Sequence, residues 1–269
     1  MEITFENYTK LKSQNLKRAE IAELFKIPDW KLKKLISVNK WGKQPSRIEN
    51  ETAFDEYSEE ACYWAGFLAA DGNVDQKGRV RIMLKYDDYS HLEKFKEFLQ
   101  STHTISSNTT KYNRCSFEFT SRYICDILDI NFNIVPNKTA IYTLPSIPNK
   151  YFRHYVRGYF DGDGSICESF SNINSSTATL YTTFASGSKD FSVELFDKLN
   201  TILLINGHLQ EFKDSNKYQI KYTTNNSRAL LSWMYKDAEV YLDRKYILYS
   251  RIVVGNNRLM RDKGIVQSH

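Results

Sequence analysis

Two stretches decide the fold: "WAGFLAADGNV" at residues 64–74 and "VRGYFDGDGSI" at residues 156–166. Each runs from a glycine through two large apolar residues to an Asp-Gly pair. Asp71 and Asp163 take equivalent places, 92 residues apart. A single Asp-Gly pair is more often a hairpin turn than a functional site. The recurrence of the whole outline indicates instead that the chain is duplicated.

The composition predicts a globular protein rather than a membrane or secreted one. The chain has 269 residues, 41% of them apolar, and a formal net charge of only +5. No apolar run is long enough to span a membrane, and no apolar signal region opens the sequence. The four cysteines lack a paired metal-ligand spacing. We therefore expect a reduced setting, bacterial or phage-encoded cytoplasmic or organellar, and a charge that permits a nucleic-acid partner without requiring one.

Residues 1–46 are expected to form a small helical unit. The segment 18–25 places its apolar residues on one helical face, the break Lys26-Ile27-Pro28 follows, and Asp29 is a plausible start for a second helix. This order fits a helix-turn-helix, with Lys31 and Lys34 as candidate DNA contacts. It fits a purely structural helical hairpin equally well.

The remaining chain divides into a linker, two similar halves and a tail. Apolar and polar residues alternate with period two in four segments, which is the pattern of half-buried strands. Each half then has the order αββαββα, and the fold class is α+β with a pseudo-twofold duplication. The expected ranges are a linker at 47–57, halves at 58–148 and 149–240, and a basic helix with a tail at 241–269.

Small residues recur four apart before each aspartate, at Gly66 and Ala70 and at Gly158 and Gly162. Residues four apart share one helix face, and small side chains let two helices approach closely. If these two helices pack side by side and parallel, Asp71 and Asp163 meet at their C-terminal ends.

Two neighbouring carboxylates at helix C-termini repel each other unless a cation joins them. Oxygen-only ligands favour Mg²⁺ or a similar hard ion, and the backbone carbonyls of Ala70 and Gly162 are candidate further ligands. A calcium-binding loop is excluded, because its required glycine and glutamate positions hold Ile166 and Asn172.

Cations line the polar side of the expected strands, a pattern that fits a phosphodiester substrate. Arginine and lysine read guanine in the major groove, and glutamine can read adenine. Others hold phosphates. The candidate DNA-binding residues of the strands and their ends are Arg79, Arg81, Lys85, Arg114, Lys189, Lys217, Gln219 and Lys221.

The two glycine-rich stretches resemble the signature motifs of the LAGLIDADG homing endonucleases in their single-chain, two-motif form. The match is strongest at the glycine, the apolar pair and the closing Asp-Gly, and the resemblance extends over about residues 55–250. It implies two curved sheets that form a saddle over the major groove of a long double-stranded DNA site. It also implies a monomer.

The resemblance implies that Asp71 and Asp163 are metal-binding catalytic acids, with Lys85 as an electrostatic helper near the attacking water. Mg²⁺ or Mn²⁺ is the expected cofactor, and Ca²⁺ is expected to bind without supporting cleavage. Residues 185–187 (Ala-Ser-Gly) hold no cation at the place equivalent to Lys85, so Lys189 and Lys138 are the candidates to compensate.

Three functions are compared on this basis. The first is a site-specific DNA endonuclease. The second is a non-cutting DNA- or RNA-binding protein of the same fold, such as an intron maturase or a transcriptional regulator. The third, an intein, is disfavoured because the sequence neither starts with Cys or Ser nor ends with Asn. Two retained acids favour the first function.

Overall fold

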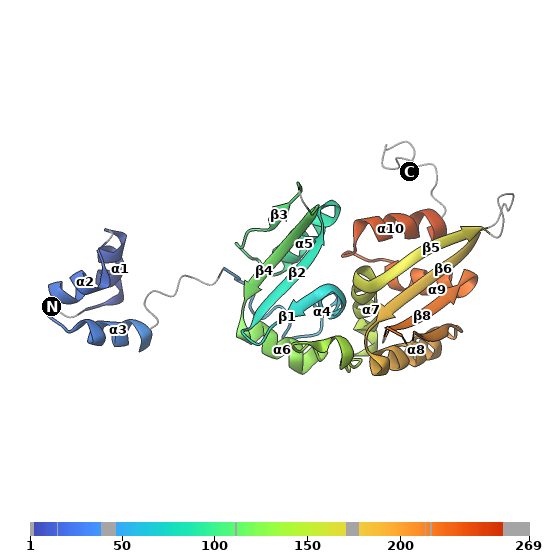
Figure 1. Cartoon of the computed structure of the whole chain (residues 1–269), viewed down its shortest axis with the longest axis horizontal. Helices are drawn as coiled ribbons and strands as arrows, with labels where there is room; N and C mark the ends of the chain where they lie inside the picture. Colours follow the sequence, from blue (N-terminus) through green and yellow to red (C-terminus); the bar gives the residue numbers. More distant parts are fainter. Residues whose placement is uncertain are drawn as a thin grey trace. The chain divides into compact units, whose positions relative to one another are not determined.

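The chain forms two compact units, Met1–Arg47 and Ile48–His269. The computed structural model describes residues 3–14, 16–38, 47–110, 112–170, 178–212, 214–215 and 217–254 (Figure 1). In this part of the chain no helix combines the length and apolar character needed to cross a membrane.

The N-terminal unit consists of three helices, α1 (Phe5–Ser13), α2 (Arg18–Leu24) and α3 (Asp29–Val38). Its small core is formed by Tyr8, Ile21, Ala22 and Leu32. The sequence predicts the second and third helices but not the first, because α1 is mostly polar and has few residues to mark an apolar face. Helix α1 nevertheless completes the core, because its Tyr8 packs with Ile21, Ala22 and Leu32.

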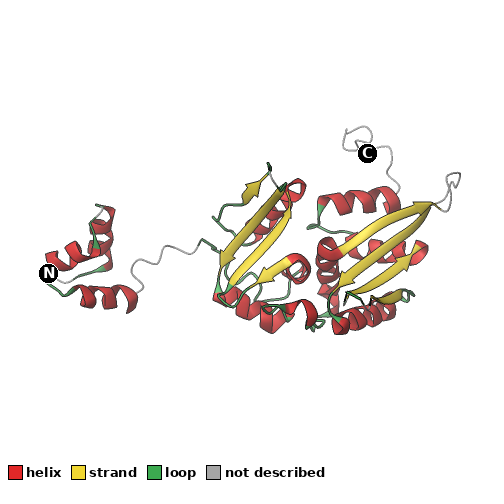
Figure 2. Ribbon diagram, viewed as in Figure 1, coloured by secondary structure: helices red, strands yellow, loops and turns green. Residues whose placement is uncertain are grey.

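The second unit confirms the duplicated α+β plan (Figure 2). Its first half comprises α4 (Glu59–Asp71), β1 (Gly72–Val74), β2 (Arg79–Lys85), α5 (Tyr89–Phe98), β3 (Ser106–Asn108), β4 (Arg114–Thr120) and α6 (Arg122–Phe132). Its second half comprises α7 (Asn149–Asp163), β5 (Gly164–Phe170), β6 (Ala178–Ser186), α8 (Lys189–Leu203), β7 (His208–Phe212), β8 (Lys217–Thr223) and α9 (Thr224–Tyr235).

Short helical segments follow or interrupt these elements. They are η1 (Tyr86–Asp88), η2 (Lys138–Ala140), α10 (Asp243–Tyr249) and η3 (Ser250–Val254). The basic helix expected within 241–269 corresponds to α10 and η3. The tail beyond residue 254 lies outside the described residues.

Each half contains one antiparallel four-stranded sheet, with strand orders β1-β2-β4-β3 and β5-β6-β8-β7. The registers match: Gly72 pairs with Ile82, and Gly164 pairs with Phe184. Counting from these pairs, Gly187 is the counterpart of Lys85. Helices α5 and α6 pack on one face of the first sheet, and α8 and α9 pack on one face of the second (Figure 2).

The alternating sequence explains why each sheet has one covered face. Val80, Ile82 and Leu84 of β2 are buried, whereas Arg79 and Lys85 are exposed. Because side chains alternate across a strand, the polar residues share the face that the helices leave uncovered. The two polar faces are therefore the surfaces on which a large ligand can lie.

Helices α4 and α7 meet through their glycines, and their backbones come close together. A Cβ atom added at Gly66 would lie 2.1 Å from the backbone oxygen of Tyr155, and one added at Gly158 would lie 1.9 Å from that of Tyr63. Further along, Gly162 lies against Ala70. Contacting residue numbers rise together on both helices, so the helices run parallel and their C-termini meet.

Residues 48–57 pack against the first half, which differs from the linker interpretation of 47–57. Ile48 and Phe54 are buried. The side-chain nitrogen of Asn131 on α6 donates to the backbone oxygens of Phe54 at 3.0 Å and Asp55 at 3.2 Å. The segment is mostly polar in sequence, but its two buried apolar residues, Ile48 and Phe54, hold it against the first half.

The two halves exchange their trailing segments. After α6, the chain reaches the second half, where Ser188 donates through its hydroxyl to the backbone oxygen of Tyr142 at 2.5 Å. After α9, the chain reaches the first half, where the Nζ of Lys94 lies 2.6 Å from the carboxylate of Asp243. Each half therefore helps to hold the end of the other, and the two halves form one unit.

The substitution Gly158→Ala tests the helix contact. We expect a loss of about 2–3 kcal/mol in the free energy of unfolding, because the backbone clash outweighs the ~1 kcal/mol gained in helix propensity. Urea denaturation followed by circular dichroism measures it. Gly187→Ala is the control, because the nearest atom to its added Cβ is a Thr139 methyl carbon at 2.8 Å, which can move. An equal or smaller loss for Gly158→Ala would contradict this account.

Candidate active site

Asp71 and Asp163 are the last residues of α4 and α7 and lie next to each other. A Cβ atom added at Gly162 would lie 3.4 Å from the backbone nitrogen of Asp71 and 3.5 Å from its carboxyl carbon. The Asp71 carboxyl group therefore sits against the final turn of α7, which carries Asp163. Parallel packing of the glycine faces is what brings together two residues so distant in sequence.

The electrostatic state of the acids reflects this closeness. Burial of the Asp163 carboxyl group and the charge of Asp71 raise the pKa of Asp163 to about 6. The positive charges of Lys245 and Lys138 act in the opposite direction. Burial also raises the pKa of Asp71, opposed chiefly by Lys245 and Arg244. Solvent still reaches both side chains. When both carboxylates are ionised, their negative charges are poorly compensated. A bound cation would reduce the repulsion between them.

Two buried lysines donate to the backbone just beyond the acids. The Nζ of Lys138 donates to the backbone oxygen of Gly72 at 2.6 Å. The Nζ of Lys245 donates to the backbone oxygens of Gly164 at 2.6 Å, Asp161 at 2.9 Å and Phe160. Each lysine places positive charge at the negative end of a helix dipole.

Burial lowers the pKa of both lysines, because a desolvated ammonium loses hydration. For Lys245 the pKa falls to about 8, although Asp161, Asp71 and Asp163 act to raise it. For Lys138 burial lowers the pKa against the charges of Asp163 and Asp71. The acids and the lysines therefore form one coupled cluster across both halves.

The surroundings of the two acids differ. Asp71 opens onto a cleft of about 520 Å³ whose other charged lining residues are Lys85, Asp87, Asp88, Arg114 and Arg244. Asp163 lines a much smaller pocket of about 40 Å³ with Lys138, Thr139, Tyr159, Ser186 and Gly187 among its walls. Lys85 thus faces the Asp71 side, and on the Asp163 side its place is taken by glycine.

Arg244 and Asp88 link the two halves at the rim of the larger cleft. The Nε of Arg244 lies 3.1 Å from a carboxylate oxygen of Asp88, which is 8% exposed. Arg244 belongs to α10 at the end of the second half, and Asp88 precedes α5 in the first. This pair anchors the segment that carries Lys245.

Asp161 has a structural place that differs from that of Asp163 two residues later. It is fully buried and accepts hydrogen bonds from the hydroxyl of Tyr63 at 2.7 Å, the hydroxyl of Tyr235 and the backbone nitrogen of Leu242 at 2.8 Å. These donors come from α4, α9 and the start of the trailing segment. Asp161 therefore ties three elements together behind the site and does not face it.

The donors at the site fit a hard divalent cation. Asp71 and Asp163 offer carboxylate oxygens, and the nearby backbone at Ala70 and Gly162 offers carbonyls of the kind such ions accept. Within the described residues, no group of three or more His, Cys, Asp and Glu side chains is placed to hold a metal. The remaining ligands would have to be carbonyls, waters or substrate oxygens.

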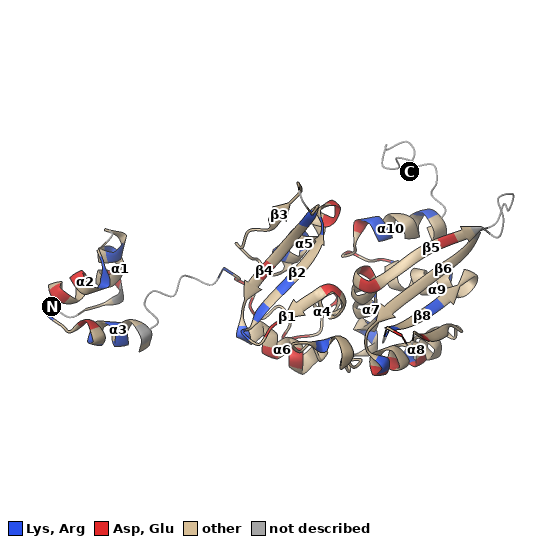
Figure 3. Cartoon of the chain, viewed as in Figure 1, with Lys and Arg blue, Asp and Glu red and all other residues tan. Residues whose placement is uncertain are grey.

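The predicted cations of the first half lie on β2 and β4 (Figure 3), and the burial pattern of these strands puts them on the open face of the sheet. Lys85 pairs directly with Arg114, and Arg81 pairs with Glu118, to which it forms an ion pair of 3.7 Å. Arg79 is held by Asp75 at 3.1 Å. The face is therefore basic but carries one carboxylate in its middle.

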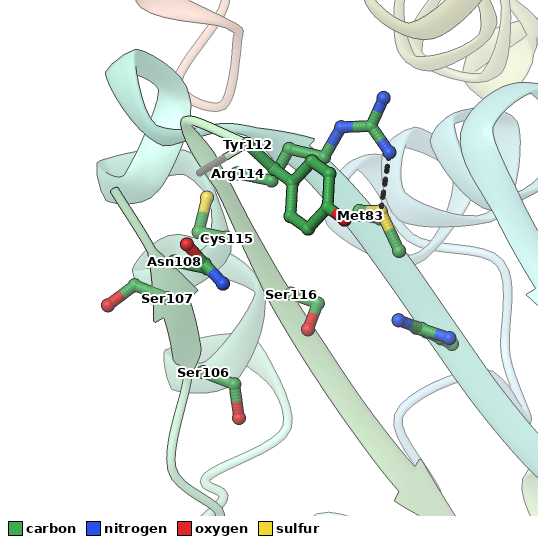
Figure 4. Close-up of a pocket in the computed structure, with 9 residues that line it drawn as sticks. Met83, Ser106, Ser107, Asn108, Tyr112, Arg114, Cys115 and Ser116 are labelled. Atoms are coloured by element: carbon green, nitrogen blue, oxygen red, sulfur yellow. Dashed lines mark hydrogen bonds between the residues drawn. The ribbon is translucent and has the colours of Figure 1, made fainter. Parts of the chain in front are cut away.

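A cavity of about 350 Å³ lies on this face between β2, β3 and β4 (Figure 4). Arg114 extends over the strands towards Met83, with its Nη1 3.8 Å from the methionine sulfur. Arg81, Tyr112 and small polar residues complete the lining. The cavity combines guanidinium donors with apolar and hydroxyl surface.

The second sheet has a different character. Lys217, Gln219 and Lys221 share the open face of β8, and the Nζ of Lys221 lies 4.1 Å from the ring centroid of Tyr181 on β6. The sequences of β5, β6, β7 and β8 contain no arginine. Hydroxyl, amide and aromatic side chains replace the guanidinium groups of the first sheet.

Three of the candidate DNA contacts belong to helices rather than to strands. Lys189 is the first residue of α8, exposed at the end of the second sheet. Lys31 and Lys34 are exposed on α3 of the N-terminal unit. The acids and Lys85 therefore share a site, whereas Lys189 begins a helix beside the second sheet and Lys31 and Lys34 belong to the N-terminal unit.

Sequence reasoning missed Lys245, Arg244 and Asp88. The duplication offered a signal, because Lys138 and Lys245 make equivalent contacts after the two motifs. The spacing obscured it: Lys138 follows the end of α6 by six residues, and Lys245 follows the end of α9 by ten. Asp88 follows Asp87 and Lys85 just before α5, and nothing in the sequence distinguishes it from an exposed surface charge.

The raised pKa of Asp163 predicts a pH-dependent effect of Asp163→Asn in metal-free buffer. The folded-state pKa of about 6 lies above the ordinary value of 3.8, so between these values the folded protein holds a proton that the unfolded chain releases. Ionised Asp163 therefore destabilises the wild type at pH 8, and this contribution fades as the pH falls towards 4. The variant should be more stable than the wild type at pH 8, and this advantage should vanish near pH 4.

Urea denaturation in the presence of EDTA at several pH values measures this difference. Asp71→Asn is the background control: the pH dependence contributed by Asp163 should weaken there, because the charge of Asp71 is one of its causes. A stability difference that stays constant with pH would show that Asp163 is not strained by its surroundings.

The chain was compared with protein families, curated proteins and solved structures, and only solved structures match it. No protein-family model matches the sequence, and no curated protein matches it. The meganuclease I-SmaMI bound to uncleavable DNA is 14% identical, with 73% of this chain and 91% of that chain covered and a TM-score of 0.51. I-SmaMI with uncleaved DNA and calcium ions is 12% identical, with 78% and 93% covered and a TM-score of 0.51.

The LAGLIDADG homing endonuclease I-GzeII in complex with its DNA target is 11% identical, with 79% of this chain and 94% of that chain covered and a TM-score of 0.52. Similarity at this level of identity concerns the fold. The two glycine-faced helices, the duplicated αββαββα order and the two four-stranded sheets agree with it. The chain has the fold of the LAGLIDADG homing endonucleases.

Proposed function

We propose that this protein is a site-specific, metal-dependent endonuclease that hydrolyses one phosphodiester in each strand of a long double-stranded DNA site. The observation that carries the proposal is the adjacency of Asp71 and Asp163 at the meeting ends of α4 and α7. The uncovered polar faces of the two sheets support it. So does the fold, because the solved structures that share it include endonucleases bound to DNA, one of them with calcium ions.

Asp71 and Asp163 are the residues that would hold the divalent cation, Mg²⁺ or Mn²⁺, with backbone oxygens at Ala70 and Gly162 as further ligands. When bound, such a cation polarises the scissile phosphate and stabilises the leaving oxygen. Ca²⁺ is expected to occupy the same ligands without supporting cleavage. The raised pKa of Asp163 means that the chain binds the cation best above about pH 6.

The basic residues around the acids have separate roles. Lys85 is exposed in the cleft beside Asp71 and offers a positive charge to an incoming phosphate. Lys138 and Lys245 hold the backbone turns after the acids and thereby fix where the carboxylates point. These two are positioning residues. Because the Asp163 side has glycine where the Asp71 side has Lys85, the two strands should be cut at unequal rates.

The first sheet should read base pairs at its centre and bind phosphates at its edges. Glu118 lies among cations, and a carboxylate facing a phosphate would be repelled. This part of the face therefore suits the floor of the major groove, where Glu118 can accept from the amino group of cytosine and Arg81 can donate to guanine. The second sheet, which lacks arginine, should favour A·T pairs through Gln219 and its hydroxyl side chains.

A non-cutting DNA- or RNA-binding protein of the same fold, such as an intron maturase or a transcriptional regulator, is the alternative. It would have no use for two mutually repelling carboxylates held together at helix ends. The raised pKa of Asp163 and the buried lysines beside it are costs that binding alone does not require. Cleavage explains why these residues lie together.

Asp71→Asn and Asp163→Asn test the proposal. The DNA site is first obtained by selecting bound duplexes from a randomised library in Ca²⁺. We expect each variant to lose about 100-fold or more in cleavage rate with Mg²⁺, because each removes a charge that holds the cation. Affinity for the selected duplex in Ca²⁺ should change by only a few-fold.

Asp129→Asn on the exposed side of α6 is the matched control and should cut at the wild-type rate. Wild-type cleavage by both Asp71→Asn and Asp163→Asn would exclude the assignment of the acids. Specific binding without cleavage by the wild type, in either metal, would favour the non-cutting alternative.

Arg81→Ala should relax specificity at one guanine of one half-site. A bidentate arginine contact discriminates between bases by about 1–3 kcal/mol, so the preference for guanine at this position should fall by about 5- to 150-fold while other positions keep theirs. Repeating the library selection with the variant measures it. Lys221→Ala on the second sheet is the control, and any change it causes should lie in the other half-site. Unchanged selected sequences for Arg81→Ala would contradict base reading by this residue.

A further inference from the structure

The charge of this chain is unequally divided between its two units. Residues 1–47 contain 11 lysines and arginines against 5 aspartates and glutamates, a formal net charge of +6. Residues 48–269 contain 26 against 27, a formal net charge of −1. All of the excess positive charge therefore belongs to the N-terminal unit, and the unit with the two acids is close to neutral.

The N-terminal unit has its own core and a fixed arrangement of α2 and α3. Arg18, at the start of α2, and Asp29, at the start of α3, form two hydrogen bonds of 2.7 Å. Between the helices, Lys26 adopts a left-handed conformation with φ of 54°, and Pro28 precedes α3. Two helices joined by a short turn and packed on a third helix are the framework that presents a helix to DNA.

The outer surface of α3 is basic and carries an aromatic ring. Leu32 is fully buried in the core and fixes which side of α3 faces inward. Lys31, Lys33 and Lys34 are exposed, and Trp30 is 66% exposed. A solvent-exposed tryptophan beside three lysines has no role in the small core that α3 completes.

We propose that the N-terminal helical unit is a second DNA-binding site, which lays α3 against duplex DNA independently of the two sheets. The lysines match the phosphates, and an α-helix fits the width of the major groove. The other unit is close to neutral and attracts DNA only weakly at long range, which explains why a separate basic unit is useful. Long-range attraction to DNA comes from the basic unit, and tethering then raises the effective concentration of the sheets at the DNA.

The proposal shares its partner with the proposed endonuclease function but stands on different residues. Its test uses the full-length protein, with fluorescence anisotropy on a 20-base-pair duplex of non-target sequence at KCl concentrations from 50 to 300 mM. The variant Lys31→Gln/Lys33→Gln/Lys34→Gln should bind about 10-fold or more weakly at 100 mM. Its slope of log affinity against log salt should fall by about 2–3, because each phosphate contact contributes about 0.9.

Lys10→Gln/Lys12→Gln/Lys17→Gln is the matched control, since it removes the same charge from exposed positions of the same unit. It should lose at most a few-fold in affinity. Equal losses in the two variants, or none in either, would overturn the proposal. A 20-nucleotide RNA that binds the wild type more tightly than the duplex does, and that alone depends on the α3 lysines, would overturn it in favour of RNA.

Two further measurements separate this proposal from the endonuclease function. The α3 variant should keep the wild-type single-turnover cleavage rate at saturating selected DNA, whereas Asp71→Asn should keep the wild-type salt slope.

Trp30→Phe should lose a fluorescence change that the wild type shows when the non-target duplex is added, and no change in the wild type would count against α3 as the contact. A protein that fails to cut but shows the lysine-dependent slope keeps the DNA-binding unit without the nuclease.

Discussion

The close backbone contact between α4 and α7 is the constraint on which the rest of the structure depends. Gly66 and Gly158 allow it, because any side chain at either position would collide with a backbone oxygen of the other helix. The contact sets the parallel direction of the helices and the register of their ends. It thereby decides that Asp71 and Asp163 are neighbours and that the two sheets extend from a shared centre.

Bringing two acids together has a cost, and the surrounding structure partly offsets it. Lys138 and Lys245 bind the backbone immediately beyond the acids, from segments that each follow one half. Asp161, which accepts from the hydroxyls of Tyr63 and Tyr235, also accepts from the backbone nitrogen of Leu242 and so holds the second of these segments. The compensation is incomplete, as the raised pKa of Asp163 indicates, and a bound cation would offset the remaining negative charge.

The duplication is nearly symmetric in backbone but not in chemistry. Lys85 and Gly187 occupy equivalent places beside the two acids, and arginine is present on one sheet and absent from the strands of the other. Under the proposed function, a DNA site that is not palindromic would meet this protein in one orientation. The basic N-terminal unit adds a third kind of surface, distinct from both sheets in charge and in secondary structure.

The sequence by itself determined the α+β class, the duplication and the pairing of Asp71 with Asp163. These follow from local rules: alternation with period two marks the strands, and small residues four apart mark a face that must pack closely. The order of the seven elements in each half was also predicted, although alternation marks only four of the strands and β3 is exposed throughout. The helix α1 was not predicted, since its polar composition leaves little periodic signal.

Only the tertiary structure decided the rest of the site. Lys245 and Arg244 reach it because the segment after α9 crosses to the first half, and the segment after α6 crosses to the second. Residues 48–57 lie on the first half because Ile48 and Phe54 are buried there. No local pattern encodes such crossings. They depend on which surfaces remain open once α4 and α7 have packed, and that is a property of the whole fold.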